Sequence, residues 1–305
     1  MINLRKIFSI IFIGIFTYFL IDFIQQNSGL LENFKKLNFF LLIILLLLTL
    51  LNQFIKGYVN IYLFNSLNIS MKLKESFEIS YKNTLGNLIG PIKAGAGYKL
   101  HYMNKNYNVS PTQFVSLNTA YSVISIIVSI FILLITLLLA NNTSPASIEL
   151  LILVLFALSI STFLGVNLLL FFSKKVSINI ISNFANGFKS VYLNKLNFIY
   201  ILLIALFHQI YSIFIIFFIF EIFSFNIDLL SSAIYSTVGS LGNFANITPG
   251  NIGFYELVMI SSNFLHGVST EQVLISSVLA RAISYCSVVF IYIYYLSKKL
   301  IQRTQ

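Results

Sequence analysis

The sequence predicts an all-α polytopic membrane protein with six full spans and two opposed re-entrant helical hairpins, related as an inverted repeat. Composition predicts the membrane class, because only 9% of the 305 residues are charged and 58% are hydrophobic. A soluble domain carries about 25% charged residues. Several apolar runs also reach the ~20 residues with which a helix crosses a bilayer. The one-sided distribution of lysine and arginine then sets how the chain is threaded.

Six apolar runs are long enough to be full spans, and we expect one transmembrane helix for each. The first run follows Arg5 and Lys6 and has no clear small-residue cleavage site, so we expect a retained anchor helix. The six runs cover approximately residues 7–24, 38–63, 112–140, 147–172, 197–222 and 271–297.

Basic residues gather in alternate loops between these runs, which predicts that both termini face the cytoplasm across an inner membrane. The opposite loops contain only Lys35 and Lys36 as bases. The net charge of +10 therefore indicates cytoplasmic loop anchors rather than a nucleic-acid partner. The cytoplasmic set is Arg5, Lys6, Lys72, Lys74, Lys82, Lys99, Lys105, Lys174, Lys175, Lys189, Lys195, Lys298, Lys299 and Arg303.

Two stretches interrupt the apolar pattern with Gly and Pro. Each begins with Leu-Gly-Asn, at Leu85 and at Leu241, which are 156 residues apart. Residues 76–110 begin and end on the predicted cytoplasmic side, and residues 229–268 begin and end on the outer side. A broken helix leaves backbone groups that lipid cannot satisfy. Re-entrant hairpins are therefore favoured over pairs of short spans.

We expect one membrane domain, residues 1–305, made of two halves, 1–140 and 141–305. Each half contains one of the two broken stretches. Each half has two spans, a broken segment and a third span, and an odd number of spans inverts the second half. Discontinuous helices in inverted repeats are typical of secondary transporters. Chance recurrence of Leu-Gly-Asn is the alternative. We expect Asn87, Asn243 and Asn246 to satisfy the broken backbone.

Arg281 is the strongest single candidate for a binding residue. It lies near the middle of the last span, where an arginine costs ~2.5–3.5 kcal/mol on insertion scales and faces a cavity or a partner. Ser277, Ser284, Tyr285 and Tyr292 share its helical face by their spacing of three to four residues. We expect this face to point inward.

Glu256 is the expected partner of Arg281, as a structural ion pair or as a gate that an anionic substrate opens. A guanidinium binds phosphate in the same bidentate way as it binds a carboxylate. The break at Thr248, Pro249 and Gly250 precedes Glu256 and would start a helix whose N–H groups face an anion.

Lys93 and Lys99 are the first-half counterparts, near Gly95 and Gly97. They would contact phosphate at the cytoplasmic mouth, or Lys99 would anchor at lipid headgroups. His208 inside the fifth span is either a proton carrier or, as we favour, an interhelical hydrogen-bond partner. The predicted substrate-binding residues are Arg281, Glu256, Pro249, Gly250, Thr248, Asn243, Tyr285, Lys93 and Lys99.

The segment Thr248-Pro249-Gly250-Asn251-Ile252-Gly253-Phe254-Tyr255-Glu256, with Gly267-Val268 and Arg281 after it, carries a family resemblance. The chain resembles the lysylphosphatidylglycerol synthase transmembrane-region family, whose pattern is T-P-G-G-x-G-x-x-E, a G-V pair and an Arg in the last helix. Asn251 replaces the second Gly of that pattern. The resemblance covers nearly the whole chain.

The first half resembles the family pattern more loosely, from Pro91 through Gly95 to Lys99. Family members often carry an acid after that Gly and an Arg further on, where this chain has Ala96 and Lys99. An acidic–basic pair near the next helix start is missing around Thr119-Ala120.

The resemblance implies lipid handling. In multidomain members such a region moves an aminoacylated phospholipid after a separate soluble domain makes it, and stand-alone relatives are associated with glycolipid or polyprenyl-linked sugar pathways. We therefore expect a flippase-like lipid translocase for an anionic phospholipid or a lipid-linked saccharide of the cell envelope. We expect transport rather than catalysis, without cofactor or metal. A glycosyltransferase or aminoacyl-lipid synthase would be its partner.

Three other functions suit the same pattern. An ion-coupled small-solute transporter would share the architecture. DedA-like proteins also pair inverted re-entrant segments, so the architecture alone does not identify the family. A membrane enzyme acting on a polyprenyl phosphate would need a base near the surface, for which Asp228 or Glu271 is available. A non-catalytic partner of a glycosyltransferase is the third.

Overall fold

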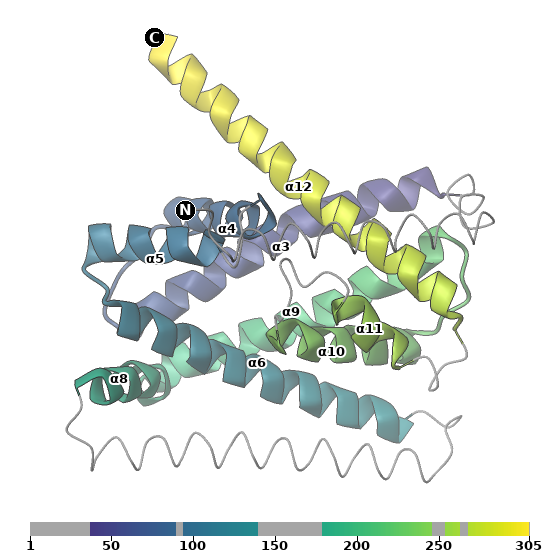
Figure 1. The fold of residues 1–305 in the computed structure, drawn as a ribbon, viewed down its shortest axis with the longest axis horizontal. Coiled ribbons are helices and arrows are strands. Elements are labelled where there is room, and N and C mark those ends of the chain that lie inside the picture. Colours follow the sequence, from purple (N-terminus) through teal and green to yellow (C-terminus); the bar gives the residue numbers. More distant parts are fainter. Residues whose placement is uncertain (1–36, 90–93, 140–178, 246–253, 263–267, 305) are drawn as a thin grey trace, which may run out of the picture.

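The computed structural model describes residues 37–89, 94–139, 179–245, 254–262 and 268–304, and every regular element in these ranges is a helix (Figure 1). Four of the helices are long and apolar enough to cross a membrane. They are α3 (Phe39–Asn65), α6 (Pro111–Leu139), α9 (Lys195–Ile222) and α12 (Thr270–Thr304), with Thr270–Tyr295 as the apolar part of α12. These helices coincide with four predicted spans, whereas the runs at 7–24 and 147–172 lie outside the described residues.

Five shorter helices lie between the long ones. The predicted stretch 76–110 holds most of α4 (Leu73–Ile89), which begins three residues earlier, and all of α5 (Ala94–Tyr107). The stretch 229–268 contains α10 (Leu229–Ala245) and α11 (Phe254–Ile260). The fifth is α8 (Asn179–Leu193), which precedes α9 and was not predicted. Ala185, Phe188 and Val191 are buried on one face of α8, because spacings of three residues fall on the same side of a helix.

Corresponding helices of the two halves begin with the same capping chemistry. The side chains of Asn38 and Asn194 accept hydrogen bonds from the first backbone N–H groups of α3 and α9, and these two residues are 156 positions apart. Before α6, Ser110 and Gln113 form a reciprocal capping box, and Ser269 and Gln272 form the same box before α12. α4 and α10 are both 17 residues long and also begin 156 residues apart.

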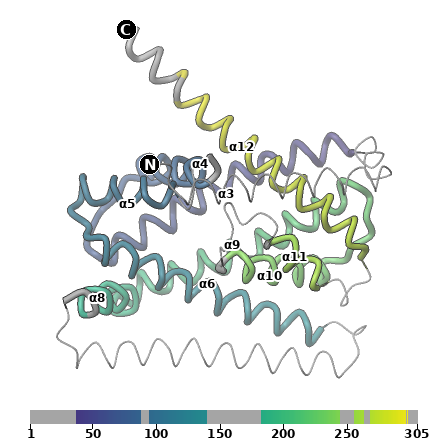
Figure 2. Tube along the Cα trace, viewed as in Figure 1, coloured from purple at the N-terminus to yellow at the C-terminus, as the bar shows by residue number. Residues whose placement is uncertain are grey.

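α3 and α9 lie side by side and antiparallel along their lengths (Figure 2). At one end the backbone N of Asn38 donates to the backbone O of Ile222 at 3.3 Å. At the other end the side chain of Asn65 donates to that of Asn197 at 3.1 Å. The first long described helix of each half therefore runs in the opposite direction to its counterpart.

The helical hairpins close through glycines at corresponding positions. A Cβ at Gly86 of α4 would lie 2.7 Å from the Cα of Gly95 of α5, and one at Gly242 of α10 would lie 2.9 Å from a side-chain carbon of Val258 of α11. Gly is needed at these two positions because the facing helix leaves no room for a side chain.

Asn87 has the role predicted for it. Its side-chain oxygen accepts a hydrogen bond from the backbone N of Ala96 at 3.3 Å, and Ala96 lies in the first turn of α5. The first N–H groups of a helix have no intrahelical partner, so this bond satisfies one of them. Asn246 lies outside the described residues.

Two apolar clusters form most of the described core. One surrounds Phe64, Phe114 and Leu117, and the other surrounds Leu45, Phe220 and Ile283. In Figure 1, α4, α5 and α8 lie toward one end of the long helices, and α10 with α11 lies toward the other.

Candidate functional site

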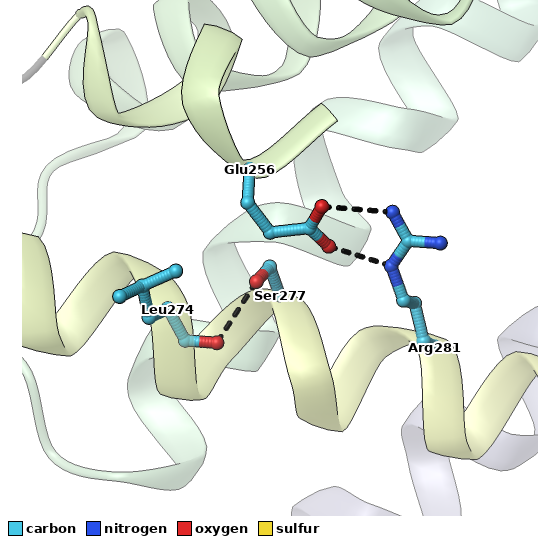
Figure 3. Close-up of polar contacts among 4 residues, drawn as sticks. All are labelled: Glu256, Leu274, Ser277 and Arg281. Atoms are coloured by element: carbon cyan, nitrogen blue, oxygen red, sulfur yellow. Dashed lines mark hydrogen bonds and ion pairs between the residues drawn. The ribbon is translucent and has the colours of Figure 1, made fainter. Parts of the chain in front are cut away.

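An ion pair between α11 and α12 lies at the centre of the candidate site (Figure 3). Nε of Arg281 lies 2.6 Å from Oε1 of Glu256, and Nη2 lies 3.1 Å from Oε2. The pairing is bidentate, which is the stronger geometry for a guanidinium and a carboxylate. The Glu256 side chain is only 7% exposed and that of Arg281 is 20% exposed. The partner predicted for Arg281 is therefore the one observed.

An aromatic ring and a helix terminus support the pair. Cζ of Arg281 lies 5.6 Å from the ring centroid of Tyr255, within the range of a cation–π contact. Glu256 lies in the first turn of α11, where the helix dipole favours a negative charge. Behind Tyr255, a Cβ at Gly239 of α10 would lie 2.9 Å from the ring, so the glycine lets the ring pack against α10.

The side chains predicted to share one inward face of α12 differ in how deeply they are buried. Ser277 is buried one turn before Arg281 and donates to the backbone O of Leu274 at 2.8 Å. Ser284 and Tyr285 are half-buried beyond Arg281, but Tyr292 is exposed. The expectation that Tyr292 points inward is therefore wrong, because at this level α12 packs on α4 through the neighbouring Ile291 and Tyr295 instead.

The structure does not bring all the predicted site residues together. Asn243 is an exposed residue of α10, next to the Gly242 contact. Thr248, Pro249, Gly250 and Lys93 lie outside the described residues. Within the described ranges, no group of three or more His, Cys, Asp or Glu side chains is arranged as metal ligands would be.

Lys99 occupies a separate buried position. It is only 7% exposed, and its Nζ donates to Oδ1 of Asn60 at 2.6 Å. The rings of Phe64 and Phe114 lie 5.4 and 5.6 Å from Nζ. Two ion pairs are present among the residues that the structure describes, and their bases are Lys82 and Arg281 rather than Lys99. Lys99 is therefore enclosed by amides and aromatic rings and does not anchor at a surface, contrary to one of the two expectations.

Burial gives Lys99 a pH-dependent effect on stability. α5 is not one of the candidate spans, and burial disfavours the charged ammonium, which lowers the pKa of Lys99 from 10.5 to about 8. Charged Lys99 thus costs stability below pH 8, and this cost disappears as the pH rises from 8 to 10.5.

We expect the Lys99→Met variant to be the more stable protein at pH 7, because it lacks the buried charge. Wild type should regain up to about 3 kcal/mol relative to Lys99→Met between pH 8 and 10.5. Thermal unfolding of both proteins in detergent across this pH range measures the difference in their stability. A stability difference that does not change with pH would contradict the burial of a charged Lys99.

A polar row on α3 was missed in the sequence. Asn52, Gln53, Lys56 and Asn60 recur at helical spacing inside an apolar run, and that spacing is the signal that could have revealed it. Oδ1 of Asn52 lies 3.2 Å from Nε2 of His208, so His208 makes the favoured interhelical hydrogen bond.

Gln53 and Gln209 occupy corresponding positions, 156 residues apart. Gln53 accepts from the Thr84 hydroxyl of α4 at 3.1 Å. Gln209 donates to the Ser236 hydroxyl of α10 at 3.1 Å and accepts from Ser129 of α6 at 3.0 Å. Each glutamine therefore binds its span to the following hairpin, which a single span sequence does not reveal.

Comparison with known proteins identifies the family. The family model described as the lysylphosphatidylglycerol synthase TM region matches residues 6–291, so the chain belongs to this family. No curated protein matches the chain significantly, and no solved structure does.

Proposed function

We propose that this member of the lysylphosphatidylglycerol synthase TM region family is a lipid translocase that moves an anionic phospholipid or a lipid-linked saccharide across the cytoplasmic membrane. The bidentate pair between Arg281 and Glu256, near the middle of a candidate span, is the observation that carries this proposal. Both termini would face the cytoplasm, as the basic segments indicate.

The geometry of the pair suits exchange with a lipid phosphate. A phosphate presents two oxygens to a guanidinium as a carboxylate does, so it can take the place of Glu256 while Arg281 stays paired. An unpaired charge in the membrane interior is costly, so this exchange keeps Arg281 paired but requires the released Glu256 carboxylate to take up a proton or reach water. Arg281 is the more exposed partner, which leaves its guanidinium within reach of a headgroup.

The internal correspondence of the two halves supports an inverted-repeat transporter. The capping residues, the helix lengths and the glycine contacts recur, and α3 runs antiparallel to α9. The two hairpins would be re-entrant segments that enter from opposite sides, within a total of six spans. A glycosyltransferase or an aminoacyl-lipid synthase would supply or use the lipid.

An ion-coupled solute transporter is the second candidate, and the contact between His208 and Asn52 favours it. This contact lies at the middle of α3 and α9, where polar groups often mark ion pathways. Such a transporter would depend on a proton or sodium gradient and would be indifferent to the lipid headgroup.

Lipid flipping in proteoliposomes tests the proposal. Fluorescent phosphatidylglycerol, a lipid-linked saccharide and zwitterionic phosphatidylethanolamine would be compared for wild type, Arg281→Ala and Glu256→Gln. We expect wild type to move one of the two anionic lipids faster than the zwitterionic lipid. Removal of the guanidinium should lower that rate at least about tenfold, since it removes an interaction of more than ~1.4 kcal/mol. Unchanged flipping by both variants would refute the assignment of these residues.

A further inference from the structure

An apolar groove of about 380 Å³ lies between α3 and α9, away from the ion pair. One end is bounded by Leu51 and Phe207, and the other by Tyr62 and Tyr200, whose rings stack at 4.8 Å. Leu203, which lines the groove, is 56% exposed. All residues that line it are aliphatic or aromatic. Since both helices are candidate spans, the groove opens toward hydrocarbon rather than water.

The groove has the length of one bilayer leaflet. Its inner end adjoins Asn52 and His208, the middle residues of the two spans. From Leu51 to Tyr62 the helix rises ~17 Å, close to half of the ~30 Å hydrocarbon core. The outer end carries tyrosine side chains, which prefer the membrane interface because the ring is apolar and the hydroxyl is polar.

The two halves of the chain differ at several positions along this groove, and one of these differences involves a hydrogen bond. Ile55 of α3 and Ile204 of α9 both line it. Their counterparts 156 residues away are Tyr211 and Leu48, and the Tyr211 hydroxyl donates to the backbone O of Leu48. This hydrogen bond joins α9 to α3 at the corresponding position in the other half of the two helices. Isoleucine has no hydroxyl group, so Ile55 and Ile204 make no such bond at the groove.

We propose that this groove binds one hydrocarbon chain of a membrane lipid, extended from the surface to the midplane in a single leaflet. The basic segments of α4, α5 and α8 lie toward the end of the bundle where α9 begins, so the leaflet is the cytoplasmic one by the positive-inside rule (Figure 1). The lining excludes a headgroup, and the length suits an acyl or prenyl chain. The inference requires that α3 and α9 cross the bilayer and does not require that the protein moves the lipid.

Photo-crosslinking tests the inference directly. The protein is placed in nanodiscs of phosphatidylglycerol that contain a trace of the same lipid with a diazirine within one acyl chain. We expect the label on α3 and α9 at the groove residues, and Leu203→Trp should reduce it about tenfold by filling the groove. Leu47→Trp is the matched control, because Leu47 is the counterpart of Leu203 and is 58% exposed outside the groove. It should leave the label unchanged.

A second variant, Ile55→Tyr, copies the tyrosine of the other half and should also reduce the label. Thermal unfolding of each variant shows whether it still folds. Equal labelling of the groove and of exposed Leu138 on α6 would overturn the inference, as would full labelling of both folded variants. So would a disulfide-linked dimer of the Tyr58→Cys variant, in a Cys286→Ser background, because a second copy of the chain would then occupy the groove. A protein that is labelled at the groove but does not flip lipid would contradict the proposed translocation and leave the groove assignment standing.

Discussion

Arg281→Ala is expected to destabilise the protein by about 3–5 kcal/mol, because it leaves the buried Glu256 carboxylate without its counter-charge. The Tyr255 ring also loses its cation–π contact with the guanidinium. Glu256→Gln should be comparably harmful, since it leaves the guanidinium as the unpaired buried charge. Unfolding in mixed micelles, followed by intrinsic tyrosine fluorescence, measures both variants against wild type.

The double variant Glu256→Gln with Arg281→Ala separates charge pairing from packing. It should be less destabilised than the sum of the single variants, since it leaves no unpaired charge. Lys82→Met is the matched control on an ion pair, because Lys82 and Glu78 are 2.5 Å apart and their side chains are 32% and 39% exposed. Its effect should stay within about 1 kcal/mol. If the destabilisation of the double variant equalled the sum for the two single variants, Glu256 and Arg281 would not stabilise each other.

Gly95→Ala is expected to disrupt the α4–α5 hairpin. A Cβ at this position would overlap the backbone O of Asn83, and backbone cannot move aside as the end of a side chain can. The two helices would have to separate, at a cost of about 3 kcal/mol or more, at the upper end of overpacking effects. The measurement is the unfolding midpoint together with protease sensitivity between α4 and α5.

Gly97→Ala on the same helix provides the control. A Cβ at Gly97 meets nothing within 4 Å, so this change should stabilise α5 by about 0.5–1 kcal/mol through helix propensity alone. Equal effects of the two substitutions would mean that α4 and α5 do not make the close contact described here.

The long helices were predictable from local chemistry, although α12 continues to Thr304, seven residues beyond the predicted span. The apolar run at 38–63 became α3 (Phe39–Asn65), since a hydrophobic run in lipid must satisfy its backbone internally and an asparagine caps its start. The amphipathic helix α8 was missed because its apolar face is short and lies in a polar, lysine-containing segment.

The candidate site was predictable only where charge left few alternatives. Arg281 and Glu256 were expected to pair because two opposite charges in apolar surroundings satisfy each other. The surroundings of Lys99 were not predictable, since its burial depends on Asn60, Phe64 and Phe114 from two other helices. The interhelical hydrogen bond of His208 was expected, but its partner Asn52 was missed because the two residues are 156 positions apart.

The sequence by itself determined the membrane class, four of the described helices and the partner of Arg281, because hydropathy, capping and charge pairing act locally or leave a single solution. Only the tertiary structure decided that α3 and α9 lie antiparallel, that Lys99 is enclosed and that Ile55 and Ile204 line an apolar groove. These features depend on which side chains distant segments bring together, and periodicity within one segment carries no information about that.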